Sequence, residues 1–92
     1  MRLDLFLKAS RLVLRRSVAR QFCDANRIRV NGQTAKASKE IKAGDEIEIR
    51  RGDKRTLVRV VEVPRSKQVS KNEAGALIDI IEDERLADDP LA

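Results

Sequence analysis

Basic side chains are concentrated at the start of the chain, at spacings that suit binding to an anion. The first 20 residues hold five arginines and one lysine: Arg2, Lys8, Arg11, Arg15, Arg16 and Arg20. A planar guanidinium binds a phosphate through two parallel hydrogen bonds, which a merely solubilising surface does not need. The residue types therefore favour recognition of a phosphate-rich ligand over solubility alone.

A second feature of this segment is the pair Arg16 and Ser17, which opens the second of two helical patterns. Free backbone N–H groups and the positive dipole end of a helix attract phosphate at this position. The simpler interpretation is that Ser17 only helps to start the helix.

Residue types that support catalysis are scarce. The chain has no histidine, no glycine-rich phosphate loop, and one cysteine, Cys23, which we expect to pack as a small apolar residue. Among Asp45, Glu46 and Glu48, the two glutamates lie on the solvent side of an alternating strand pattern. The sequence therefore predicts a protein that is not an enzyme, with no metal site and no cofactor.

Charge is unevenly distributed along the 92 residues. Residues 1–71 hold 19 basic and 8 acidic side chains, whereas residues 72–92 hold 1 basic and 7 acidic ones. A basic body with an acidic end suggests a domain that binds a polyanion. Because Phe6 and Phe22 are the only aromatic residues and lie on apolar faces, stacking of unpaired bases is disfavoured. Folded RNA, contacted through its backbone, is the expected ligand.

Two helices are expected at the N-terminal end. The first has apolar or small residues at helical spacing from Leu3 to Leu14 and is predicted to end near Val13. The second is predicted from about Arg16 to Ala25. Asn26 follows where a left-handed residue commonly ends a helix.

Short strands are expected to follow. Ile28 and Val30 alternate with arginines, and Asn31-Gly32 favours a tight hairpin turn before a small returning strand around residues 35–38, with Lys36 and Lys39 outside. Residues 46–50 alternate as a half-buried strand. The β-prone run from Leu57 to Val63 is predicted to pair antiparallel to it and to stop at Pro64.

The C-terminal third is less patterned. We expect a polar, mobile linker from Arg65 to Lys71, a helix over residues 73–86, and disorder at Asp88-Asp89-Pro90. Leu77 to Ile81 would equally suit a last strand. The organisation predicted is an RNA-binding domain over residues 1–64 with a linker and acidic extension over residues 65–92.

A family resemblance supports this organisation. The segments RLDLFLKASRL, RRSVARQFCDANRIRVNG, AKAS and IKAGDEIEI, within residues 2–50, together resemble the S4 RNA-binding domain. The resemblance implies an α+β fold with the αL motif, in which two N-terminal helices pack on a small antiparallel sheet, here with a short C-terminal extension. Arg15 replaces the family's serine-type N-cap, and Asn26 replaces a glycine.

The resemblance also implies roles for individual residues. Asp4 would orient the helical pair, and the positions from which the family contacts RNA backbone correspond to Arg2, Arg11, Arg16, Ser17, Arg20 and Lys36. Adding the neighbouring cations, the predicted RNA-binding set is Arg2, Lys8, Arg11, Arg15, Arg16, Ser17, Arg20, Lys36 and Lys39.

The chain is similar to small free-standing members of the family, since residues 51–92 are too short for a catalytic unit. These members imply binding to large-subunit rRNA and peptidyl-tRNA on the large ribosomal subunit together with RqcH, where alanine tails are added to stalled nascent chains. The alternative is a heat-shock-type factor that binds and recycles aborted large subunits. A different class is a protein adaptor whose acidic residues 79–89 bind a basic partner. We expect a cytoplasmic protein with no membrane contact, monomeric when free.

Overall fold

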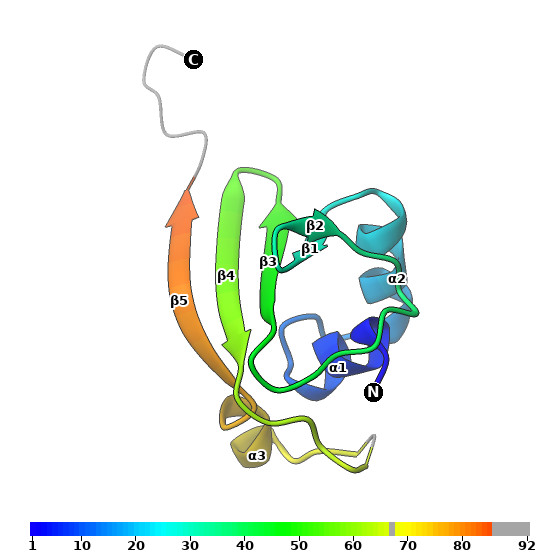
Figure 1. Ribbon diagram of the computed structural model, residues 1–92, viewed down its shortest axis with the longest axis vertical. Helices are drawn as coiled ribbons and strands as arrows, with labels where there is room; N and C mark the ends of the chain where they lie inside the picture. Colours follow the sequence, from blue (N-terminus) through cyan, green and yellow to red (C-terminus); the bar gives the residue numbers. More distant parts are fainter. Residues whose placement is uncertain (67, 86–92) are drawn as a thin grey trace.

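The computed structural model describes residues 1–66 and 68–85, with two helices packed on one face of a five-stranded antiparallel sheet (Figure 1). The sheet order is β2-β1-β3-β4-β5. This arrangement confirms the predicted α+β class and the pair of N-terminal helices. The elements are α1 (Leu3–Ala9), α2 (Arg16–Asp24), β1 (Ile28–Val30), β2 (Gln33–Thr34), β3 (Glu46–Arg51), β4 (Lys54–Val60), α3 (Lys71–Gly75) and β5 (Ile78–Arg85).

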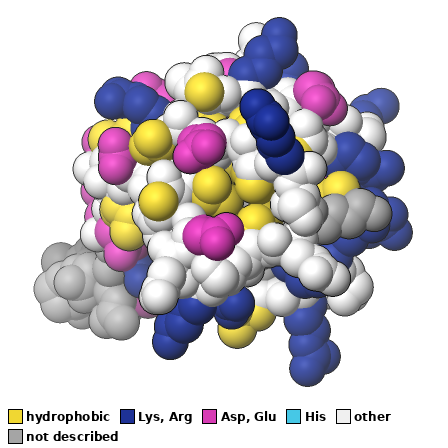
Figure 2. Space-filling model, turned by 90° about the horizontal axis from the view of Figure 1, so that it is seen from below, with side chains coloured by type: hydrophobic (Ala, Val, Ile, Leu, Met, Phe, Trp, Pro, Cys, Tyr) yellow, Lys and Arg dark blue, Asp and Glu magenta, His cyan; other side chains and the backbone are white. Residues whose placement is uncertain are grey.

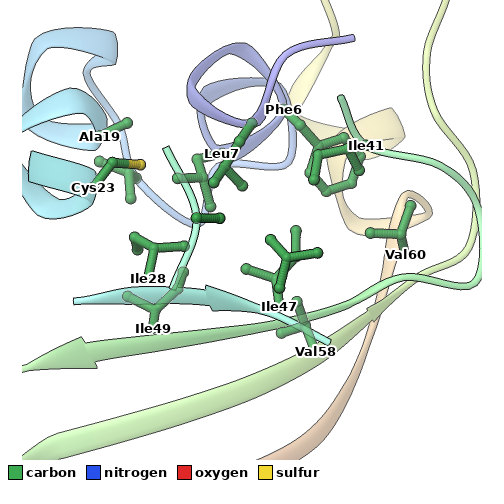
Figure 3. Packing of buried hydrophobic residues seen from close by; sticks show 14 of the residues in the cluster. Phe6, Leu7, Ala19, Cys23, Ile28, Ile41, Ile47, Ile49, Val58 and Val60 are labelled. Carbon is green, nitrogen blue, oxygen red and sulfur yellow. The ribbon is translucent and has the colours of Figure 1, made fainter. Parts of the chain in front are cut away.

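The core lies between the helical pair and the inner face of the sheet. Alternate residues of β1, β3 and β4 point to this face, as the period of two requires. Figure 3 shows Phe6 and Leu7 of α1 and Cys23 of α2 directed toward Ile28 and Ile47 of the sheet. All five side chains are buried. Removal of this apolar surface from water is the main source of stability in the fold.

Helix α1 is shorter than its apolar pattern predicts. It ends at Ala9 instead of near Val13, and Arg11 adopts a left-handed backbone conformation with φ of 60°. The chain therefore turns out of the helix, and Leu14, which fits the helical stripe, is 72% exposed. The expectation was wrong because helical spacing continued through a segment that turns toward α2.

Helix α2 starts at Arg16, as predicted, and is followed by the expected left-handed Asn26, with φ of 59°. The Arg27 N–H donates to the Phe22 carbonyl at 2.9 Å, which satisfies a carbonyl that the helix end would leave free. Asn26 thus permits a hydrogen-bonded helix end.

Replacement of Asn26 by glycine is expected to raise the free energy of unfolding by about 0.5 kcal/mol, because glycine adopts positive φ without strain. Asn31, with φ of 52°, provides the contrast. Its side-chain oxygen accepts from the Glu46 N–H at 2.9 Å, and its amide donates to Asp45 at 3.1 Å. Asn31→Gly should therefore lower stability by about 1 kcal/mol. Urea denaturation of the two variants would test this difference in sign.

The hairpins differ in extent from the prediction. The Asn31-Gly32 turn joins β1 to β2 as expected, but β2 covers only Gln33–Thr34, and residues 35–38 do not form the returning strand. β4 begins at Lys54 and ends at Val60, whereas the predicted strand ran from Leu57 to Val63. The polar residues 54–56 therefore belong to the strand, and residues 61–63 do not. Pairing of β3 with β4 is antiparallel, as predicted.

The C-terminal region joins the sheet, which corrects the expectation of a helix over residues 73–86. The Ser70 hydroxyl accepts from the Glu73 N–H at 3.2 Å and caps the short helix α3, inside a stretch that was interpreted partly as linker. β5 then pairs with the whole of β4. The strand alternative was correct, and the strand is longer than Leu77 to Ile81. The expected disorder at Asp88-Asp89-Pro90 lies outside the described residues.

The outer face of the sheet carries a network of ion pairs. Arg55 of β4 contacts Glu48 of β3 at 2.7 Å and Glu84 of β5 at 3.2 Å, and it also contacts Glu82. Burial raises the pKa of Glu48, but the hydrogen bond and charge of Arg55 outweigh it and lower that pKa overall. Several acidic side chains of β5 are thus already paired within the sheet. None of the helices in the described part of the chain is long and apolar enough to cross a bilayer.

Candidate nucleic-acid interface

Three of the predicted arginines surround one buried carboxylate at the start of α1. Asp4 is 0% exposed. Its Oδ1 atom lies 3.2 Å from the Nε atom of Arg2. Its Oδ2 atom lies 3.1 Å from the Nε atoms of both Arg16 and Arg20. Because Arg16 and Arg20 are four residues apart, they lie on the same face of α2. We call Asp4 with these three arginines the arginine cluster.

The arginine cluster holds its guanidinium groups while leaving them open to a ligand. Arg16 and Arg20 bond Asp4 through Nε, and within residues 1–66 and 68–85 their terminal Nη groups have no hydrogen-bond acceptor. Their side chains are 36% and 52% exposed. Arg2 approaches Asp4 without hydrogen-bond geometry, so its buried Nε has no acceptor in the same residues. The terminal Nη groups of Arg16 and Arg20 are therefore positioned to bind an anion from solvent.

The charge state of Asp4 follows from competing effects. Burial alone would raise the pKa of this carboxyl, but hydrogen bonds from Arg16 and Arg20, the charge of Arg16, and the Leu5 N–H lower it below the ordinary value. Asp4 is therefore ionised at neutral pH. Three cations facing one anion leave the cluster positive, which favours a phosphate.

The loop with Lys36 and Lys39 is joined to the same end of α1. The first two N–H groups of the helix, at Leu3 and Asp4, donate to the carbonyls of Lys39 at 2.7 Å and Ala37 at 3.1 Å. Both lysines are exposed and line a shallow pocket of about 310 Å³. The structure thus places this loop next to Arg2.

Lys8 and Arg11 lie at the opposite end of α1. They are exposed and share a pocket of about 560 Å³ with Leu14, Val69 and Glu73. In the described part of the chain, no ion pair or side-chain hydrogen bond joins either residue to the arginine cluster. The structure therefore divides the predicted cations between two ends of one helix.

Arg15 and Ser17 flank the start of α2 and are both exposed. The N-cap residue, Arg15, makes no side-chain capping bond, so the helix begins without the usual serine-type acceptor. Free N–H groups of the first turn remain available to an anion. Ser17 is the second residue of the helix, so its hydroxyl does not occupy the N-cap position.

Cys23 behaves as expected of a small apolar residue. It is 4% exposed, and burial, with the charges of Asp4 and Asp24, raises its pKa to about 11. A thiol in this state is protonated and unreactive.

Charged side chains are unevenly spread over the face shown in Figure 2. Lysine and arginine side chains are most frequent on its right side and project from its top and bottom, whereas acidic side chains lie mostly at its left and centre. Basic residues of the sheet lie outside the predicted RNA-binding set. Among these, Arg51 and Lys54 lie at the β3–β4 turn, and their position opposite each other would have been a signal.

The family can be assigned from this fold and from the basic surface. The S4 domain model matches residues 1–47, which contain α1, α2, β1, β2 and the start of β3. The chain therefore belongs to the S4 domain family.

Full-length relatives narrow the assignment. A protein of Streptococcus pneumoniae named RQC P-site tRNA stabilizing factor is 44% identical over 94% of this chain and 96% of its own length. A Bacillus subtilis protein of the same name is 43% identical over 96% and 100%, respectively. These relatives confirm the resemblance to the small free-standing branch, which contains RqcP.

A solved structure agrees with the fold. Heat shock protein 15 of Vibrio cholerae, described as trimeric, superposes with a TM-score of 0.78 at 30% identity. The match covers 87% of this chain and 80% of that protein. The similarity extends beyond residue 47, so it includes sheet residues outside the family match.

Proposed function

We propose that the chain is a non-catalytic factor of ribosome-associated quality control that binds the large ribosomal subunit and stabilises tRNA in the P site. The name of the full-length relatives supports this role. The arginine cluster is the structural observation that carries it, because guanidinium groups fixed by a buried carboxylate are suited to RNA phosphates.

At finer detail, the ligands are large-subunit rRNA and peptidyl-tRNA, and the chain works in the cytoplasm with RqcH while alanine is added to the stalled nascent chain. It is a monomer when free. Residues 1–64 supply the RNA-binding domain, and residues 65–92 form an extension, of which β5 completes the sheet.

The proposed RNA-binding surface keeps all predicted residues. The arginine cluster binds one stretch of RNA backbone. The loop with Lys36 and Lys39 and the start of α2 make further contacts with the RNA backbone. Such contacts position the protein without reading sequence. The set is Arg2, Lys8, Arg11, Arg15, Arg16, Ser17, Arg20, Lys36 and Lys39.

A heat-shock-type role in recycling aborted subunits is the second candidate. The similarity to the V. cholerae heat shock protein 15 structure favours this role, but the sequence identity to that protein is only 30%. The relatives named for P-site tRNA match at 43% and 44% over nearly the whole chain. Quality control is therefore the preferred function.

Arg16→Ala and Arg2→Ala are each expected to weaken binding to purified large ribosomal subunits about tenfold, the effect of losing one charged hydrogen bond. Co-sedimentation at fixed salt measures this. Arg59→Ala is the control, since Arg59 pairs with Glu46 on the outer face, away from the cluster. Circular dichroism checks that each variant is folded. Undiminished binding by both cluster variants would refute the proposed face.

A further inference from the structure

A small basic pocket lies between the α1–α2 loop and the β3–β4 hairpin. Its volume is about 200 Å³, and Leu12 and Ile49 supply apolar lining. Three cations from separate segments also line it, namely Arg11, Arg51 and Lys54. Convergence of cations from a loop and two strands is unlike the scattered charge of an ordinary surface.

The cross-strand register makes this concentration unfavourable for the fold itself. Arg51 and Lys54 are directly opposite on β3 and β4, and Arg50 and Arg55 form the adjacent pair. Like charges facing each other across a sheet are destabilising. Arg55 is neutralised by the outer-face glutamates, whereas Arg51 has no carboxylate partner in the part of the chain that the structure describes.

Arg51 is nevertheless held in place. Its guanidinium carbon lies 5.7 Å from the centroid of the Phe22 ring, in the last turn of α2. A cation near a helix C-terminus is favourable, which would explain Arg51 by structure alone. That explanation does not account for Arg11, which lines the same pocket.

Among the residues that the structure describes, one carboxylate lines the same pocket. Asp83 of β5 lies 3.4 Å from the Lys54 ammonium and accepts a hydrogen bond from the Thr56 hydroxyl at 3.0 Å. Three cations against one carboxylate leave the pocket positive. Asp83 fixes Lys54 but also opposes the entry of an anion.

Arg11 connects this pocket to the surface described above. It lines both the pocket that contains Lys8 and the pocket that contains Arg51. Its left-handed backbone, unusual for a residue with a side chain, places it at the turn between them. The basic surface is thus continuous from α1 onto the inner face of the sheet.

We propose that Arg11, Arg51 and Lys54 form a second phosphate-binding site, which holds a further segment of RNA backbone. The inference rests on the proposed function, that the chain binds RNA through α1 and α2. It adds the β3–β4 hairpin to the interface. The ligand is backbone phosphate, since the pocket offers cations and no exposed aromatic ring.

The double variant R51A/K54A tests the site, with binding to purified large ribosomal subunits as the measurement. Affinity should fall about tenfold, and the slope of log affinity against log salt should flatten by about 1 to 2, as expected for the loss of one or two phosphate contacts. The matched control R29A/R59A removes two arginines that alternate with buried residues and face the outer side of the sheet. It should change affinity less than twofold.

Asp83→Asn provides a test of opposite sign. Loss of the opposing carboxylate should tighten binding about threefold, whereas Asp79→Asn, on the same strand opposite Arg59, should not. A damaged fold does not produce tighter binding, so this variant remains decisive if R51A/K54A is unstable. Equal behaviour of R51A/K54A and R29A/R59A, or no gain from Asp83→Asn, would overturn the proposal.

Further measurements distinguish failure of the second phosphate-binding site from failure of the proposed function. Inorganic phosphate at constant ionic strength should displace more wild-type protein than chloride does, because the site binds phosphate, and R51A/K54A should reduce this difference. If Arg16→Ala weakens binding while R51A/K54A does not alter it, only the second site is refuted. If wild-type protein does not bind the subunit, the proposed function itself fails.

Discussion

Asp4→Asn is expected to lower the free energy of unfolding by about 2 kcal/mol and to weaken binding to large ribosomal subunits. Breaking a buried ion pair costs roughly 3–5 kcal/mol, and the value is reduced here because the three arginines are partly exposed. The amide keeps the shape of the side chain but removes its charge. The guanidinium groups then repel one another and lose their common anchor.

Binding should fall more than the loss of stability explains. At a temperature where the variant is fully folded, its affinity should decrease by at least the tenfold expected for one arginine, because the positions of all three depend on Asp4. Co-sedimentation combined with urea denaturation measures both effects. Normal affinity in a destabilised Asp4→Asn protein would show that Asp4 serves the fold alone.

Acidic pH should remove the difference in the free energy of unfolding between the wild-type protein and Asp4→Asn. The pKa of Asp4 is lower in the folded state, so its contribution is complete above the ordinary aspartate value of 3.8 and is lost as pH falls through the lowered pKa. Urea midpoints of wild type and Asp4→Asn should therefore converge below pH 3.8. Glu48 also titrates, but both proteins retain it. A gap that stays constant from pH 7 into this acidic range would contradict the ionic role.

Phe6→Ala is expected to have the largest effect on stability, a loss of about 3–4 kcal/mol in the free energy of unfolding. Phe6 is 0% exposed, and it packs between α1 and the sheet (Figure 3). A domain of this size has roughly 5–14 kcal/mol in total. The variant should therefore unfold at a much lower urea concentration.

Leu14→Ala is the matched control, because Leu14 continues the same helical spacing in the sequence but is 72% exposed. Its effect should stay within about 0.5 kcal/mol. Equal losses from Phe6→Ala and Leu14→Ala would mean that α1 extends along its apolar pattern and that the observed end at Ala9 is wrong.

The sequence was most informative where residue chemistry and spacing coincide. Alternation in Glu46 to Arg50, the Asn31-Gly32 turn and the left-handed Asn26 each require a definite backbone geometry, and all three are observed. The spacing of apolar residues predicted a helix that continues past Ala9, which was wrong, because this spacing does not show where the backbone turns. Ser70 and Glu73 carried a capping signal, but the polar residues around it were interpreted as a linker.

The candidate site was predictable in composition but not in arrangement. Arginine bias identified the basic helices, and family resemblance suggested that Asp4 orients them. Only the fold shows that Asp4 is buried and contacts three arginines at once. Arg51 and Lys54 were missed because their proximity to Arg11 depends on contacts between distant segments.

The irregular pairing of β5 bears on how the sheet ends. A register shift opposite Leu57 and Val58 interrupts the ladder, and acidic side chains flank Ile80 and Ile81 on the open edge. Bulges and charges of one sign are the features by which natural sheets prevent other strands from adding to them. A second copy that approached this edge would have to pair with an interrupted strand that carries many charged side chains. These features oppose the addition of a further strand to β5.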